Sequence, residues 1–116
     1  MIIIKSQDQI EAMRPAGALS KLTLRRVGAM IMPGVSTIEL DRVAESVIRS
    51  HGGTPAFKGY GGFPGTICAS INDEVVHGIP SRDRILCEGD IISIDTGATV
   101  NGWVGDNAWT FAVGHI

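Results

Sequence analysis

Residues 94–111, IDTGATVNGWVGDNAWTF, predict two antiparallel strands joined by a tight turn at Asn101-Gly102. Asn-Gly between two apolar runs is the strongest short-range indication of a two-residue β-hairpin, and such a turn fixes the register of its strands. Side chains alternate between the two faces of a strand. Asp95 and Asp106 are therefore expected on one face as diagonal neighbours, with backbones about 7–8 Å apart.

The same register predicts which side of the hairpin is buried. It pairs Val100 with Trp103, Thr99 with Val104, Gly97 with Asp106, and Asp95 with Ala108. The face opposite the aspartates is the more apolar one and is expected to meet the core; it carries Ile94, Ala98, Val100, Trp103 and Trp109.

Two neighbouring carboxylates raise a question of charge. Asp95 and Asp106 repel each other unless a proton or a cation lies between them. Carboxylate oxygens are suitable ligands for divalent ions, and a pair of such ions can bind and activate one water for hydrolysis. The alternative is that both aspartates simply face solvent. The spacing D-x10-D has little specificity by itself, so the hairpin leaves both interpretations open.

Composition predicts one globular domain. The chain has 116 residues, of which 44% are hydrophobic and 19% charged, and its net charge is −2 without a block of like charges. Nothing in this pattern indicates a nucleic-acid or membrane partner. The apolar start MIII is too short for a signal peptide or a membrane span. Cys68 and Cys87 are expected as free thiols, as is usual in the cytoplasm.

Two helices are expected before the sheet. Ser6 with Gln9, and Ser36 with Glu39, match the capping-box pattern that opens a helix. The second helix is expected to end at residues 51–53, HGG. Its apolar stripe consists of Leu40, Val43, Ala44, Val47 and Ile48.

The segment between the helices and the hairpin contains the remaining strands. Residues 52–65 hold six of the fifteen glycines and three aromatic rings, Phe57, Tyr60 and Phe63, and predict neither helix nor strand. This segment is either a plain surface loop or the wall of a pocket. Residues 66–71 and 75–79 predict strands, the second containing His77. A lone histidine there is more often structural than catalytic. The fold class is therefore α+β, with helices covering one face of an antiparallel sheet.

Four stretches together resemble the type I methionine aminopeptidases. They are IKSQDQIEAMR (4–14), PGVSTIELD (33–41), GYGGFPGTICASINDEVVHGIP (59–80) and IDTGATVNGWVGDNAWTFAVG (94–114). The VVHGIP stretch separates this family from the related proline-cleaving peptidases. The resemblance covers essentially all of residues 1–116. It implies one methionine aminopeptidase-like domain with the pita-bread (creatinase/aminopeptidase-like) fold, of which this chain is the N-terminal half.

The family removes the initiator methionine from nascent proteins with two divalent metal ions, which are cobalt, manganese, iron or zinc. By resemblance, Asp95 and Asp106 are metal ligands, and Asp106 bridges both ions. His77 matches the family's catalytic histidine that contacts substrate without binding metal. The pocket for the methionine side chain is implied at Tyr60, Phe63 and Cys68, with Phe57 nearby. The implied substrate is the N-terminal peptide of nascent proteins, met in the cytoplasm, with the ribosome as a further partner.

The family's remaining metal ligands lie in a second half that follows the last residue of this chain. The resemblance therefore implies a metalloaminopeptidase fragment that is inactive alone. A different class of function is a non-catalytic half-domain that binds a nascent chain or partner. A third possibility is self-association, in which two copies imitate the missing half.

Overall fold

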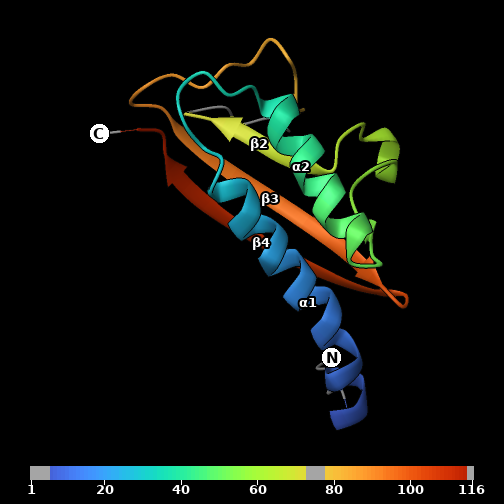
Figure 1. Ribbon diagram of the computed structural model, residues 1–116. Helices are drawn as coiled ribbons and strands as arrows, with labels where there is room; N and C mark the ends of the chain where they lie inside the picture. The colour runs from blue at the N-terminus through green and yellow to red at the C-terminus, as the bar shows by residue number, and fades with distance from the viewer. Residues whose placement is uncertain (1–5, 73–77, 115–116) are drawn as a thin grey trace, which may run out of the picture.

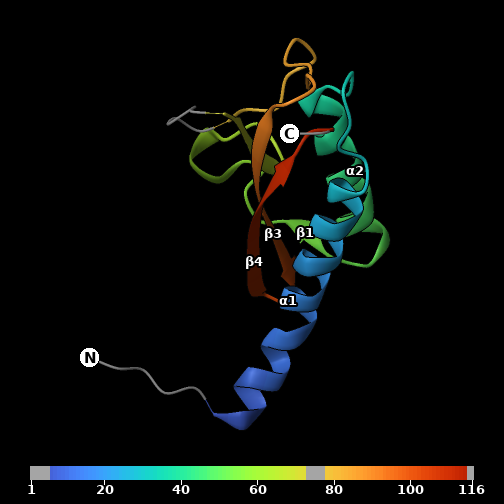
Figure 2. The same ribbon diagram turned by 90° about the vertical axis from the view of Figure 1, so that its left-hand side faces the viewer.

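The computed structural model describes residues 6–72 and 78–114. Two helices lie side by side on one face of an antiparallel sheet (Figures 1 and 2), which confirms the predicted α+β class. In chain order the elements are α1 (Gln7–Gly28), α2 (Thr37–Ser50), β1 (Thr54–Pro55), the 3-10 turn η1 (Tyr60–Gly62), β2 (Ile67–Ile71), β3 (Ile91–Val100) and β4 (Trp103–Ala112).

Both helices begin where the sequence predicts. The Ser6 hydroxyl accepts a hydrogen bond from the Gln9 amide at 3.2 Å, and the Gln9 side chain accepts one from the Ser6 amide at 2.9 Å. At α2 the Ser36 hydroxyl accepts from the Glu39 amide at 3.3 Å. These bonds satisfy backbone donors that the first turn of a helix leaves without partners. Helix α2 ends at Ser50 with His51 as its C-cap, as expected from the glycines that follow.

Strand β3 is the centre of the sheet. It pairs with β4 along its whole length, and on its other side with β2 and with the two residues of β1. The β3–β4 register matches all four pairs predicted from the Asn101-Gly102 turn. Strand β1 was not predicted. Of the strand expected at residues 75–79, residues 75–77 lie outside the described residues, and Gly78 and Ile79 are not in a strand.

The core lies between the helices and the helix-facing side of the sheet. Ile94 and Ala98 are buried there, as predicted, against the apolar stripe of α2. The prediction for Trp109 was wrong, because its side chain is 65% exposed. Trp109 faces the helix side, opposite Ile94, but β4 pairs only with β3 among the described strands. The indole therefore sits at the rim of the sheet, where the helices do not cover it.

Helix α1 packs unusually close to β4. Gly105 is buried, and a Cβ at this position would clash with the Ala16 carbonyl and lie 2.5 Å from the Gly17 nitrogen. Polar contacts cross the same interface: the Ser20 hydroxyl donates to the Thr96 carbonyl at 3.1 Å and accepts from the Asn107 amide group at 3.1 Å. These contacts fix the hairpin against the helix layer on the side away from the aspartates.

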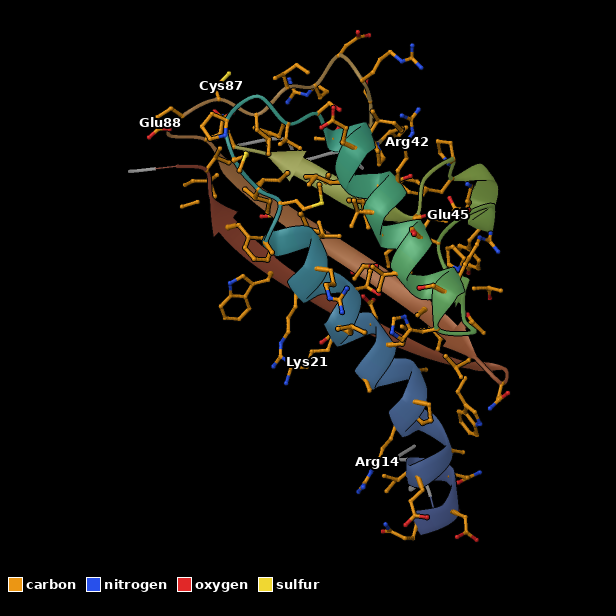
Figure 3. The ribbon with its side chains drawn as sticks, viewed as in Figure 1. Arg14, Lys21, Arg42, Glu45, Cys87 and Glu88 are labelled. Carbon is orange, nitrogen blue, oxygen red and sulfur yellow. The ribbon has the colours of Figure 1, made fainter. Side chains whose placement is uncertain are left out.

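The outer surface of the helix layer is polar. Arg14 and Lys21 of α1 and Arg42 of α2 are exposed, and Figure 3 shows where they lie on the two helices. Among the described residues, neither helix is long and apolar enough to cross a membrane.

Candidate metal and substrate site

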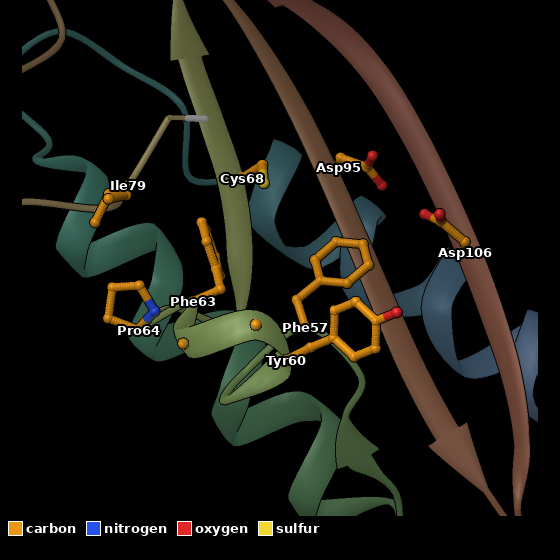
Figure 4. A pocket seen from close by; sticks show the side chains of 10 residues that line it. Phe57, Tyr60, Phe63, Pro64, Cys68, Ile79, Asp95 and Asp106 are labelled. Atoms are coloured by element: carbon orange, nitrogen blue, oxygen red, sulfur yellow. The ribbon is translucent and has the colours of Figure 1, made fainter. Parts of the chain in front are cut away.

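The hairpin brings Asp95 and Asp106 together on the sheet face that the helices leave uncovered. Asp95 pairs with Ala108, and Asp106 pairs with Gly97, so the two aspartates are diagonal neighbours on adjacent strands. Their carboxylates point toward each other (Figure 4). The predicted shared face is thus confirmed.

The electrostatics of this pair favour a proton or a cation between the two carboxylates. The Asp95 Oδ1 atom is buried and has no hydrogen-bond partner within residues 6–72 and 78–114. Burial and the neighbouring Asp106 carboxylate raise the pKa of Asp95 to about 7. A buried carboxylate oxygen without a partner is costly, and either a proton or a divalent ion removes that cost. The carboxylate oxygens present therefore fit a hard divalent metal.

A cavity of about 600 Å³ adjoins the two aspartates. Tyr60, Phe63 and Cys68 line it, so the prediction that these three gather around one cleft is confirmed. Its full lining, much of it visible in Figure 4, is Phe57, Tyr60, Gly61, Gly62, Phe63, Pro64, Cys68, Ile79, Asp95 and Asp106. Sequence reasoning missed Ile79, although it lies in the same VVHGIP stretch that carries His77. His77 itself lies outside the described residues.

The glycine-rich segment forms a wall of this cavity rather than a plain loop. Gly59, Gly61 and Gly62 have φ values of 86°, 59° and 82°, which residues with side chains rarely adopt. The Gly59 amide donates to the Phe63 carbonyl at 2.7 Å and closes the turn. The rings on either side of these glycines are consequently presented to the cavity. Tyr60 is 83% exposed, so the cavity is open on that side.

Cys68 joins the aromatic wall to the carboxylate pair. It is half-buried on β2, directly opposite Asp95 in the register with β3. Burial, and then the charges of Asp95 and Asp106, raise the pKa of the Cys68 thiol. The thiol therefore stays protonated near neutral pH and acts as a small, neutral lining group rather than as a nucleophile.

The described residues supply two carboxylates to this site and no larger ligand group. No cluster of three or more histidine, cysteine, aspartate or glutamate side chains that could hold a metal occurs in residues 6–72 and 78–114. Divalent ions in proteins bind several protein ligands when they bind tightly. Two carboxylates are therefore fewer ligands than a tightly bound divalent ion requires.

Comparison with known proteins identifies the family. Residues 11–116 match the model of metallopeptidase family M24. The chain belongs to this family, whose members depend on metal. Within the family its relatives are methionine aminopeptidases: it is 56% identical over 116 residues to that of Clostridium acetobutylicum and 53% identical over 116 residues to methionine aminopeptidase 1 of Bacillus subtilis. All of the chain is covered in both matches, but only 46% of each relative.

Solved structures show the same relationship. The methionine aminopeptidase of Rickettsia prowazekii superposes with a TM-score of 0.94 at 40% identity, with all of this chain and 46% of that chain covered. The prolidase of Pyrococcus furiosus superposes with a TM-score of 0.82 at 25% identity, with 97% of this chain and 32% of that chain covered. The chain therefore has about half of the pita-bread fold, corresponding to the N-terminal half of its methionine aminopeptidase relatives.

Proposed function

We propose that residues 1–116 supply the N-terminal half of a methionine aminopeptidase, which removes the initiator methionine from nascent proteins. The observation that carries this proposal is the Asp95–Asp106 pair at the edge of an aromatic cavity, in a chain 56% identical to a methionine aminopeptidase. The nascent N-terminus as substrate, the ribosome as its source and the cytoplasm as the location belong to the same proposal. These three assignments rest on the similarity of the chain to methionine aminopeptidases.

The proposed ligands of two divalent ions, cobalt, manganese, iron or zinc, are Asp95 and Asp106. The unpartnered Asp95 Oδ1 and the opposed carboxylates support this assignment. When bound, the ions supply Lewis-acid polarisation of the scissile carbonyl and lower the pKa of water. The carboxylates hold and orient the ions at one end of the cavity, and so fix where the first peptide bond must lie.

The proposed pocket for the methionine side chain is formed by Phe57, Tyr60, Phe63 and Cys68. Aromatic rings favour a thioether, because the polarizable sulfur packs well against ring edges. Phe57 and Phe63 are half-buried and supply this apolar surface, whereas the exposed Tyr60 ring lies at the open side of the cavity. His77 keeps its proposed role as a substrate-contacting catalytic residue, on the family resemblance alone.

The test is methionine release by a reassembled enzyme. The chain is joined to the C-terminal half of the Clostridium acetobutylicum relative and assayed with Met-Gly-Met and added manganese or cobalt. We expect turnover from the joined protein and none from the 116-residue chain alone. Replacing either aspartate, as Asp95→Asn or Asp106→Asn, should lower turnover by about a hundredfold or more, since each removes a charged metal ligand.

A matched control separates the site from general charge effects. Asp83→Asn removes the same charge from an exposed position outside the cavity, and turnover should be unchanged. Full activity of the Asp106→Asn protein would contradict the metal assignment. A folded joined protein that releases no methionine, while the intact relative does, would contradict the enzyme proposal and favour a non-catalytic binding module.

A further inference from the structure

Helix α2 presents a row of polar side chains toward the segments that build the cavity. Thr37, Asp41 and Glu45 follow one another at intervals of four residues, which places them one above the next on one face of a helix. Thr37 is 1% exposed and Asp41 is 6% exposed. We call these three residues the polar stripe. None of them lines the cavity.

The first member, Thr37, holds the segment that contains Ile79. Its hydroxyl donates to the Ser81 carbonyl at 3.1 Å and accepts from the Ser81 amide at 2.8 Å. The amide of Ile38 also donates to the Ser81 carbonyl, at 3.2 Å. One residue at the start of α2 thus satisfies both backbone groups of Ser81, two residues beyond the cavity wall at Ile79.

The second member, Asp41, holds the point where the glycine-rich segment enters β2. Its Oδ1 atom accepts hydrogen bonds from the amides of Thr66 and Ile67, at 2.6 and 3.0 Å. Gly65 leaves no space here, because a Cβ would lie 2.8 Å from the Pro80 ring and 3.2 Å from Asp41 Oδ1. The Asp41 carboxylate is therefore packed into the junction of two cavity segments.

The third member, Glu45, holds the other end of the glycine-rich segment. Its carboxylate pairs with Lys58 at 2.7 Å and accepts a hydrogen bond from the Thr66 hydroxyl at 3.4 Å. It also pairs with Arg49 of its own helix at 2.9 Å. Lys58 precedes Tyr60 and Thr66 follows Phe63, so Glu45 contacts both sides of the turn that carries these two rings. Figure 3 shows Glu45 on α2.

We propose that Thr37, Asp41 and Glu45 are positioning residues that hold the cavity wall against α2 and thereby determine which side chain the cavity accepts. The specificity part of this inference rests on the proposed function. The polar stripe runs beside the apolar stripe of α2. A polar side chain at such a position loses its hydration, which costs free energy unless it is hydrogen-bonded, whereas an apolar side chain would not incur this cost. Polar groups are present instead, and each one holds the backbone or a side chain of a segment that lines or adjoins the cavity.

Hydrogen exchange in the 116-residue chain tests the anchoring without reference to activity. Asp41→Ala removes the acceptor of two amides, so Thr66 and Ile67 should exchange about tenfold faster or more. Asp41→Asn keeps an acceptor oxygen and should restore protection to within about threefold of the unmodified chain. Arg42→Ala, an exposed truncation at the next position, is the matched control and should leave these amides unchanged.

Unchanged exchange at Thr66 and Ile67 in the Asp41→Ala chain would overturn the anchoring. Equal acceleration throughout β3 and β4 would also overturn it, because it would indicate global destabilisation. If the Asp41→Ala chain does not fold, the Glu45→Ala chain tests the anchoring instead, through amide exchange around Lys58, the partner of Glu45. Its control is Arg49→Ala. Glu45→Ala should accelerate exchange in residues 57–63, whereas Arg49→Ala should not, since Arg49 is bonded to Glu45 but not to that segment.

The specificity part is tested by a ratio of rates in the joined enzyme. The ratio compares kcat/KM for Met-Gly-Met with kcat/KM for Leu-Gly-Met. A smaller folded fraction lowers both rates equally, so only a change in cavity shape moves the ratio. Asp41→Ala should lower it by about fivefold or more, and Asp41→Asn should preserve it. An unchanged ratio with faster exchange would refute the specificity role. An inactive joined enzyme would instead refute the proposed function. The anchoring by the polar stripe would then be judged by the hydrogen-exchange result.

Discussion

Replacing Gly105 with alanine should destabilise the chain by separating α1 from β4. The added Cβ would meet the backbone of Ala16 and Gly17 rather than the end of a flexible side chain. Backbone atoms of a helix cannot move one at a time, so the helix or the strand must shift as a unit. Asp106 is the next residue on β4, and this shift would also displace its carboxylate from Asp95.

The size of the effect follows from the cost of overpacking. Inserting one methyl group into a closely packed interface costs about 2 kcal/mol, and more where backbone must move. An unfolding entropy of about 2.1 cal/mol/K per residue gives a 116-residue chain about 0.24 kcal/mol per kelvin. Gly105→Ala should therefore lower Tm by about 8 °C or more.

The same interface contains its own control. Gly17 lies inside α1, and a Cβ there would meet no atom within 4 Å among the described residues. Gly17→Ala removes backbone freedom from the unfolded chain and should raise Tm by about 2–4 °C. Thermal melts followed by circular dichroism compare the two variants. Gly105→Ala melting at or above the unmodified chain would refute the close packing of α1 on β4.

Two further predictions concern the cavity segments. Burial raises the pKa of Asp41, with Glu45 adding to the rise and Lys58 and two backbone amides opposing it, so the native state binds this proton more tightly than the unfolded state. Lowering the pH from 7 toward the ordinary aspartate pKa should therefore raise the free energy of unfolding, measured in urea, relative to that of the Asp41→Asn chain. A free energy of unfolding that falls as the pH is lowered, relative to Asp41→Asn, would show that the native state favours the charged form of Asp41. The substitution Gly97→Ala would place a Cβ 3.0 Å from the Phe57 ring, so the ring should shift. The kcat/KM of the joined enzyme for Met-Gly-Met should then fall by about tenfold. An unaltered kcat/KM would place Phe57 outside the substrate path.

The hairpin could be predicted from sequence because its determinants are local. Asn101-Gly102 sets the turn, and strict alternation then places Asp95 and Asp106 on one face without any long-range information. Alternation tells which face a residue occupies but not how far that face is covered. Trp109 was misplaced for this reason: it faces the helices but lies on the edge strand.

The remaining features depend on contacts between distant segments. Strand β1 has two residues, too few for a periodic pattern, and exists because Thr54 pairs with Thr99. The sequence analysis did not single out the polar stripe, because the partners of Asp41 and Thr37 lie 25 and 44 positions away along the chain. The unpartnered Asp95 Oδ1 likewise follows from burial, which no local pattern predicts.

Manganese titration of the isotope-labelled chain, followed by amide NMR, tests the metal site most directly. Paramagnetic manganese broadens nearby amide signals even when it binds weakly, as two carboxylates are expected to bind it. Substoichiometric manganese should first broaden the amide signals of Asp95 and Asp106, and that of Cys68, which lies on β2 opposite Asp95. The Asp106→Asn substitution should abolish this selectivity. Broadening that begins instead at Asp83 or Asp90, and persists in the Asp106→Asn chain, would contradict the assignment of Asp95 and Asp106 as metal ligands.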